Sequence, residues 1–283
     1  MPELPEVETL RRDLLTRLPG HRVSDVQVLR AESVGYPLPI ELFCARLRGQ
    51  VFAAEFTRRG KYLLLHLEGG GILAVHLRMS GRLLWKDHDA PLENHVRVRI
   101  VLEDGYELHF EDPRVFGRLW LVPDGLAPES IVTGLARLGP EPFACEFSGA
   151  YLTHRFEQRR QPVKSALLDQ QLVAGIGNIY ADEALFTSRI HPCQPAGQLA
   201  EADLIRLHGA VLTVLEQGID RRGSTLRNYT DALGVNGNYA GTAWVYGRRG
   251  QPCRICNTAI ERVRLAGRSA HFCPACQKWD RRN

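Results

Sequence analysis

The first residues of the chain, Met1-Pro2-Glu3-Leu4-Pro5-Glu6, include groups that can do covalent chemistry. A small second residue favours removal of the initiator methionine, which would leave Pro2 with a free secondary amine. An α-amino group has an ordinary pKa of about 7.7–8.0, so at neutral pH it is a better nucleophile than a mostly protonated lysine. Attack by this amine on a sugar C1′ would form an iminium ion, which labilises the neighbouring proton. The competing interpretation is that Pro2 is a common second residue and that Glu3 and Glu6 only favour a helix start.

Four cysteines near the end of the chain form the most specific pattern in the sequence. They occur as Cys253-x2-Cys256 and Cys273-x2-Cys276, separated by 16 residues, which is typical of a structural Zn2+ site. Four thiolates leave no open position for a substrate, so such a metal would build structure. The alternative is a pair of disulfides, which would need an oxidising compartment. The segment between the pairs contains Arg262, Arg264 and Arg268, which suggests a polyanionic partner.

Composition limits the class of protein. With 283 residues, 44% of them hydrophobic, the chain is long enough for at least two domains with buried cores. No apolar run reaches about 18 residues, so no transmembrane helix is expected. The acidic start lacks the apolar segment of a signal peptide, and we expect a cytosolic location. Arginine far outnumbers lysine, which suits phosphate and guanine binding but also fits a simple codon bias.

Hydrophobic periodicity predicts how these residues are positioned. A helix is expected over residues 5–18, where apolar residues recur three or four positions apart. Short strands are expected at 51–56, 61–67, 72–77, 82–85, 95–102, 106–110 and 118–122. The first half therefore predicts an antiparallel β sandwich with a leading helix, within an α+β fold.

The pattern changes near Leu138-Gly139-Pro140-Glu141-Pro142, a predicted hinge. Helical periods follow at 148–158, 162–172, 178–188, 200–217 and 223–231. Residues 233–242 are rich in glycine and predict a loop before the cysteine-containing hairpin. We expect a β-sandwich domain at 1–138, a helical domain at 139–247 and a zinc hairpin at 248–283.

Three motifs in the first half place reactive or apolar side chains in turns. Lys61 follows Arg58-Arg59-Gly60 at the start of a strand, although an exposed turn would look the same. Met79 in His76-Leu77-Arg78-Met79-Ser80-Gly81 is either a core residue or a flexible apolar wedge. Arg114 and Phe116 in Asp112-Pro113-Arg114-Val115-Phe116-Gly117 could read and unstack bases, or Phe116 could simply be buried in a turn.

A fourth motif joins two expected helices. In Gly175-Ile176-Gly177-Asn178, the asparagine is placed as an N-cap, and the free backbone N–H groups of the following helix could bind a phosphate. The alternative is an ordinary helical hairpin with good caps.

Together these stretches resemble the formamidopyrimidine-DNA glycosylase / endonuclease VIII family, and its formamidopyrimidine branch in particular. The resemblance runs in order from Met1 to Gln277. It is carried by Pro2-Glu3-Leu4-Pro5-Glu6-Val7-Glu8-Thr9, Arg59-Gly60-Lys61, His76-Leu77-Arg78-Met79-Ser80-Gly81, Asp112-Pro113-Arg114, Phe116-Gly117, Leu138-Gly139-Pro140-Glu141-Pro142, Gly175-Ile176-Gly177-Asn178-Ile179-Tyr180 and Gly267-Arg268-Ser269. Endonuclease VIII relatives usually have glycine where this chain has Leu4, which favours oxidised purines as substrates over oxidised pyrimidines.

The resemblance implies a bacterial enzyme of base excision repair. It implies a helix-two-turn-helix module in the helical domain, one structural zinc, double-stranded DNA with oxidised bases or abasic sites as partner, a monomer, and a cytoplasmic, nucleoid-associated location. The family excises oxidised purines, notably 8-oxoguanine opposite cytosine, and nicks the abasic site by β,δ-elimination.

Roles for individual residues also follow from the resemblance. Pro2 would be the Schiff-base nucleophile, Glu3 the general acid and Glu6 a supporting residue. Lys61 would assist β-elimination and Arg268 δ-elimination. DNA contacts are implied for His95, Arg114, Arg160, Lys164 and Asn178. Met79, Arg114 and Phe116 would fill the gap left by the extruded base.

The sequence departs from the family pattern at Val115, where a basic residue is frequent, and at Arg227, which replaces a frequent lysine. The 233–242 loop is also slightly long. Two functions of other classes stay open: a non-catalytic zinc-finger DNA-binding protein, and a tautomerase-like enzyme that would use Pro2 on small molecules.

Overall fold

The computed structural model describes residues 1–224 and 230–279. It divides into two compact units. The first comprises residues 1–137 and the described part of 222–238, and the second comprises residues 138–221 and the described residues from Tyr239 onward.

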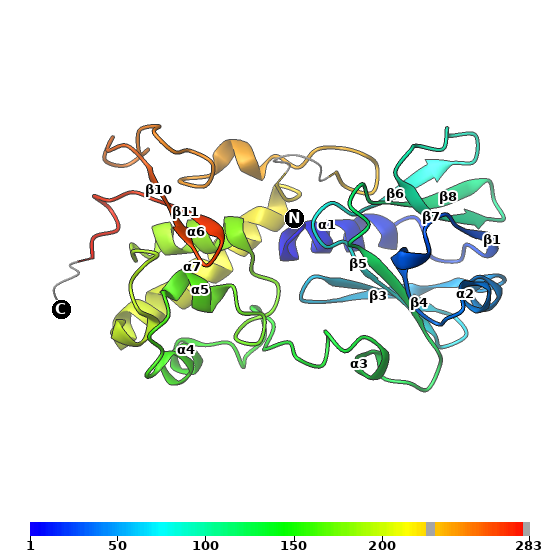
Figure 1. Cartoon of the computed structure of the whole chain (residues 1–283), viewed down its shortest axis with the longest axis horizontal. Helices are drawn as coiled ribbons and strands as arrows, with labels where there is room; N and C mark the ends of the chain where they lie inside the picture. The colour runs from blue at the N-terminus through cyan, green and yellow to red at the C-terminus, as the bar shows by residue number, and fades with distance from the viewer. Residues whose placement is uncertain (225–229, 280–283) are drawn as a thin grey trace. The chain divides into compact units, whose positions relative to one another are not determined.

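The first unit is the expected β sandwich. One sheet has the order β2-β9-β5-β4-β3, made of β2 (Val34–Tyr36), β9 (Arg118–Val122), β5 (Ile72–His76), β4 (Tyr62–Leu67) and β3 (Phe52–Arg59) (Figure 1). The other has the order β1-β7-β8-β6, made of β1 (Val23–Val28), β7 (Val96–Leu102), β8 (Tyr106–Glu111) and β6 (Arg82–Asp87). The strands pair antiparallel, except that β2 runs parallel to β9.

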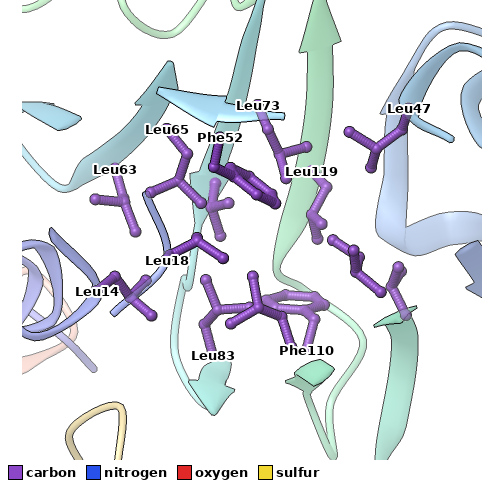
Figure 2. Close-up of a cluster of buried hydrophobic side chains, with 14 of the residues drawn as sticks. Leu14, Leu18, Leu47, Phe52, Leu63, Leu65, Leu73, Leu83, Phe110 and Leu119 are labelled. Atoms are coloured by element: carbon purple, nitrogen blue, oxygen red, sulfur yellow. The ribbon is translucent and has the colours of Figure 1, made fainter. Parts of the chain in front are cut away.

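Side chains from both sheets and the first helix share one core. Figure 2 shows Leu63 and Leu65 of β4 and Leu73 of β5 beside Leu83 of β6 and Phe110 of β8. Along β7 the alternation is as expected, because its even-numbered positions are buried while Arg97 and Arg99 are half-buried. Burial of this many leucine and phenylalanine side chains is the main source of the unit's stability.

Helix α1 (Leu4–Leu15) begins one residue before the expected start at residue 5 and ends three residues before the expected end at residue 18. Thr16 closes it, since its hydroxyl donates to the Asp13 carbonyl at 2.8 Å. On the helix flank, Glu8 forms ion pairs with Arg11, Arg12 and Arg58. Burial would raise the pKa of Glu8, but hydrogen bonds from Arg11 and Arg12 outweigh burial and lower it to about 2.

The sequence did not predict strands β1 and β2, helices α2 (Ile40–Leu47) and α3 (Pro128–Ile131), or the short 3-10 helix η1 (Ala31–Ser33) of the first unit. Strand β1 lacks a regular alternation because its register shifts between Val23 and Asp25. Helix α2 has eight residues and buries only Phe43 and Leu47, too few to give a helical period.

The segment 222–238 returns to the first unit. Arg222 donates to Asp231 at 2.6 Å and to both carboxylate oxygens of Asp13 at 2.7 and 2.8 Å. Ala232 lies in the sandwich core, and its carbonyl accepts the Trp85 N–H at 2.8 Å. The helix expected at 223–231 is absent at residues 223, 224, 230 and 231; its other positions, Arg227 among them, lie outside the described residues.

The second unit is helical, with a β hairpin near its end. Its elements are α4 (Gly149–Phe156), α5 (Val163–Leu167), α6 (Asn178–Thr187), α7 (Glu201–Asp220), β10 (Glu261–Leu265) and β11 (Arg268–Phe272) (Figure 1). Helix α5 is shorter than the expected 162–172, and α7 is longer than 200–217. Helices α4 and α6 both pack on α7, and α6 also contacts β11. In the part of the chain that the structure describes, no helix has both the length and the apolar composition needed to span a bilayer.

Candidate active site and nucleic-acid interface

The start of the chain forms a buried acidic site in the first unit. Pro2, Glu3 and Glu6 are all buried, and Glu3 and Glu6 are only 2% and 1% exposed. Glu6 Oε2 accepts the Glu3 N–H at 2.7 Å, and Glu6 Oε1 accepts the Ser224 N–H, also at 2.7 Å. Glu6 therefore ties the first turn of α1 to the returning segment. While Met1 is attached, the Pro2 nitrogen is an amide, so nucleophilic chemistry requires removal of Met1.

The close approach of the Glu6 side chain explains why residue 223 is a glycine. Gly223 has a positive φ of +79°, and a Cβ there would lie 2.8 Å from Glu6 Cγ. A larger residue would therefore push away the carboxylate that holds Glu3.

Lys61 lies in the turn between β3 and β4, one residue before the strand that it was expected to open. It is only 7% exposed, so the alternative of an exposed turn is wrong. His76, which the sequence did not single out as a site residue, lies on the adjacent strand β5 opposite Tyr62. Burial, and then the charges of Arg78 and Lys61, lower the pKa of His76 to about 3. Its Nδ1 accepts the Arg78 N–H at 3.0 Å, so this neutral ring carries its proton on Nε2.

Met79, Arg114 and Phe116 lie together at the surface of the first unit. Met79 and Phe116 are 47% and 45% exposed, which excludes the core methionine and the buried phenylalanine considered above. Arg114 Nη1 is 3.4 Å from Met79 Sδ, and its guanidinium carbon is 4.6 Å from the centre of the Phe116 ring. Two exposed apolar side chains and a cation between them have the composition of a base-stacking wedge.

Asp112 holds the two loops that carry this trio. It is fully buried, and its Oδ1 accepts the Ser80 hydroxyl at 2.5 Å and the Arg114 N–H at 3.1 Å. Its Oδ2 accepts the N–H groups of Phe116 at 2.8 Å and Gly117 at 2.7 Å. An Asp before a proline in a turn is the available sequence signal for this role, because such side chains bond backbone groups just ahead of them.

The other expected DNA contacts are mostly accessible. His95 is exposed in the first unit, and its carbonyl accepts the Asp112 N–H. Arg160 and Arg268 are exposed in the second unit. Asn178 is half-buried, and the expected N-cap role is wrong: Gly177 is the cap and Asn178 is the first helical residue. The Asn178 side chain instead points its Nδ2 at Tyr246 Oη and Ser269 Oγ, each 3.4 Å away.

Lys164 is placed differently from the DNA contact expected of it. Lys164 is only 1% exposed, and its Nζ lies 2.6 Å from Asp182 Oδ1 inside the second unit. The ammonium also donates to the backbone carbonyl of Ser269. The amine is therefore held between the Asp182 carboxylate and the Ser269 carbonyl.

The four C-terminal cysteines bring their sulfur atoms within 4.8 Å of one another. Individual sulfur–sulfur distances are 3.9 Å for Cys253–Cys276, 3.4 Å for Cys256–Cys273 and 3.5 Å for Cys256–Cys276. Zn–S bonds of about 2.3 Å in a tetrahedron place sulfurs roughly 3.8 Å apart, so the cluster fits one zinc ion. The distances are too long for the disulfides considered as an alternative.

We expect Cys273→Ser to lose zinc and to weaken DNA binding. The core around this cluster is small, formed by Phe186, Val245, Cys253, Ile260 and Cys273, so metal binding supplies much of the hairpin's stability. Metal analysis and a duplex-binding assay measure both effects. Cys145→Ser is the matched control, because Cys145 is exposed and lies outside the cluster. About one zinc per chain in Cys273→Ser would contradict this expectation.

Family models match three successive parts of the chain. Residues 1–119 match the formamidopyrimidine-DNA glycosylase N-terminal domain, residues 138–230 match the formamidopyrimidine-DNA glycosylase H2TH domain, and residues 250–278 match a zinc finger found in FPG and IleRS. A formamidopyrimidine-DNA glycosylase of Gloeobacter violaceus is 68% identical over 278 residues, which is 98% of each chain.

The chain belongs to the formamidopyrimidine-DNA glycosylase family.

Other members of the family support this assignment in sequence and in structure. A formamidopyrimidine-DNA glycosylase of Rippkaea orientalis is 48% identical over 98% of this chain and 100% of its own. The Thermus thermophilus MutM (Fpg) crystal structure superposes with a TM-score of 0.87 at 40% identity, covering 98% of both chains. A Lactococcus lactis FPG variant in complex with Fapy-dG-containing DNA gives a TM-score of 0.90 at 34% identity, covering 98% of this chain and 100% of that one.

Family membership confirms several expectations from the sequence. The protein is a DNA glycosylase for oxidised bases in DNA repair, and its family has glycosylase and AP lyase activity. The α+β fold, with its β sheets, H2TH helical module and four-cysteine zinc finger, is confirmed as well. The zinc finger and the cysteine cluster support one structural zinc.

Proposed function

We propose that Pro2 is the nucleophile that excises oxidised purines from duplex DNA and nicks the strand by β,δ-elimination. The observation that supports this most directly is the start of α1, where Pro2 and Glu3 are buried and Glu6 bonds the Glu3 amide. The proposal also draws on the Lactococcus lactis complexes, whose DNA contains Fapy-dG or an abasic site.

In the proposed reaction, the Pro2 amine attacks C1′ of the flipped-out nucleotide, the glycosidic bond electrons leave with the base, and the proton released from the Pro2 nitrogen neutralises the departing base. Glu3 gives a proton to the sugar ring oxygen, which opens the ring and leaves an iminium ion between Pro2 and C1′. Loss of a C2′ proton expels the 3′ phosphate, and a second elimination expels the 5′ phosphate. We assign Lys61 to the first of these eliminations and Arg268 to the second.

Three exposed side chains and the half-buried Asn178 would hold the DNA backbone. His95 and Arg114 in the first unit, and Arg160 and Asn178 in the second, are the proposed contacts, since phosphate contacts fix the position of a duplex. Val115 replaces a frequent basic residue, has a positive φ of 56° and is half-buried, so we propose that one family contact is missing.

We expect Arg114→Ala to reduce the preference for cytosine over adenine opposite the lesion. The guanidinium donates hydrogen bonds, and cytosine offers two adjacent acceptors on its pairing edge where adenine offers one acceptor beside a donor. Loss of a bidentate contact should cost about 1–3 kcal/mol of discrimination. Phe116→Ala should instead slow excision opposite every base, because support for the unstacked duplex does not depend on base identity.

Single-turnover excision opposite cytosine and opposite adenine measures both variants. Each serves as the control for the other, because both side chains lie on the loop that Asp112 holds. Equal slowing by Arg114→Ala opposite both bases would show that Arg114 only anchors a phosphate.

The lesion class is tested separately. We propose that 8-oxoguanine and formamidopyrimidines are preferred, and a panel of duplexes that adds thymine glycol measures this. Thymine glycol is included because the Lactococcus lactis Fpg has been crystallised with DNA that contains an oxidised pyrimidine. Faster excision of thymine glycol than of both purine lesions would contradict the proposal.

We also propose that the protein acts as a monomer on the bacterial nucleoid in the cytoplasm. The bacterial relatives support this setting. As functional modules we propose residues 1–138, 139–247 and 248–283, which the family-model matches at 1–119, 138–230 and 250–278 support, while the described part of 222–238 packs in the first compact unit.

A further inference from the structure

Asp182 and Glu183 are consecutive residues of α6, and both are fully buried. Glu183 binds the segment that precedes the zinc hairpin, and Asp182 binds strand β11 within it. The Glu183 carboxylate accepts the backbone N–H groups of Trp244 at 2.7 Å and of Val245 and Tyr246 at 2.9 Å each. Burial raises the pKa of Glu183, and these three donors oppose the rise. Glu183 therefore fixes the path by which the chain enters the hairpin.

Asp182 binds strand β11 on one side and Lys164 on the other. Its Oδ2 accepts the His271 N–H at 2.9 Å and lies 3.1 Å from His271 Nδ1. Its Oδ1 lies 2.6 Å from Lys164 Nζ, which also donates to the Ser269 carbonyl. The side chains of Lys164 and Asp182 are 1% and 0% exposed, so the pair is shielded from water and from dissolved salt. One buried ion pair thus joins α5, α6 and β11.

The part of β11 held by this pair carries proposed DNA contacts. Arg268, exposed at the start of β11, directly precedes Ser269. The Ser269 carbonyl accepts a hydrogen bond from Lys164 Nζ. The hydroxyl oxygen of Ser269 lies 3.4 Å from Asn178 Nδ2, at the start of α6. Arg268 and Asn178 are therefore tied to the same short stretch of backbone.

We propose that Lys164 and Asp182 are positioning residues whose ion pair holds β11 against the start of α6, so that Arg268 and Asn178 meet DNA in a fixed arrangement. Lys164 then serves DNA processing from inside the protein and touches no phosphate. This inference rests on the proposed DNA contacts of Arg268 and Asn178.

Amine labelling tests the placement of Lys164 in the zinc-loaded wild-type protein. The chain has only four lysines, Lys61, Lys86, Lys164 and Lys278, and the exposed Lys278 is the internal control. We expect Lys164 to react roughly tenfold more slowly than Lys278 with an amine-reactive ester, because reaction requires local opening. Labelling of Lys164 should already be slow in the absence of DNA, and it should stay slow when a duplex carrying an abasic-site analogue is added. Fast labelling of Lys164 that this duplex suppresses would overturn the proposal.

A double-variant cycle tests the ion pair itself. Lys164→Met removes the ammonium of the pair, Asp182→Asn removes the carboxylate charge, and the double variant removes both charges. We expect each single variant and the double variant to bind the abasic-analogue duplex about tenfold more weakly, with an unchanged salt slope, because all three lack the same ion pair. A direct phosphate contact predicts instead that Asp182→Asn, which keeps the ammonium, binds close to wild type, while both variants that lack Lys164 bind weakly with a salt slope reduced by about 0.9. That outcome would overturn the proposal.

The products of strand nicking separate positioning from a general loss of stability. With enzyme saturating the duplex and zinc content unchanged, Asp182→Asn should shift the ratio of β- to β,δ-elimination products in the same direction as Arg268→Ala. If Arg268→Ala changes neither binding nor this ratio, the proposed role of Arg268 fails. If Arg268→Ala changes them and Asp182→Asn does not, only the positioning role of Asp182 fails.

Discussion

Pro2→Gly should lower base excision on an 8-oxoguanine duplex by on the order of 10²-fold or more, because the variant loses the secondary amine whose iminium ion drives the later eliminations. Glycine leaves a primary amine at the chain start, so a small residual rate is compatible with this expectation. Zinc content and binding of an abasic-analogue duplex should stay close to wild type, since the cysteine cluster and the exposed basic residues are untouched. Single-turnover kinetics measure the effect.

A matched variant separates the amine from the ring of Pro2. One serine inserted between Met1 and Pro2 keeps the proline but converts its nitrogen into an amide after Met1 is removed. This variant should be as slow as Pro2→Gly, and the intact mass confirms which residue is at the N-terminus. Wild-type rates in either folded variant would contradict a nucleophilic role for Pro2.

Glu3→Gln should slow excision by roughly 10²–10⁴-fold, the usual contribution of a general acid. Glutamine has nearly the same shape but cannot supply the proton that opens the sugar ring. The Glu3 backbone N–H still reaches Glu6, so the first turn of α1 should keep its geometry. Single-turnover excision and duplex affinity are measured together, and excision should fall far more than binding.

Glu8→Gln is the control for this substitution. Glu8 lies on the same helix and is also buried, but its carboxylate is paired with Arg11, Arg12 and Arg58. The Glu8→Gln variant should therefore change the stability of the fold and leave the rate of base excision near wild type. Losses of equal size in excision and binding for Glu3→Gln would count against a role in proton transfer.

Features encoded by local spacing could be predicted from the sequence. The cysteine pairs require only two tight turns and a hairpin, so their spacing predicts the zinc site directly. The β7 alternation likewise reflects a regular strand with one buried face. The exposure of Met79 and Phe116 required the structure to decide, because a methionine at a strand end is compatible with either the core or the surface.

Features that depend on distant partners could not be predicted in the same way. The family resemblance implied a phosphate contact for Lys164, and only the structure shows that Asp182 and the Ser269 carbonyl enclose its ammonium. The buried carboxylate of Asp112 joins residues up to 32 positions away, which no local pattern records. The register shift in β1 similarly removed the alternation by which a strand is recognised.

Borohydride trapping tests the central claim most directly. The protein is incubated with an abasic-site duplex and sodium borohydride, and the N-terminal peptide of any adduct is sequenced by mass spectrometry. An iminium ion between Pro2 and C1′ would be reduced to a stable bond, so we expect one covalent adduct per active molecule, located on Pro2. No adduct from folded, zinc-loaded protein, or an adduct on Lys61 in place of Pro2, would contradict the account, and a complete absence of adduct would favour a non-catalytic DNA-binding protein.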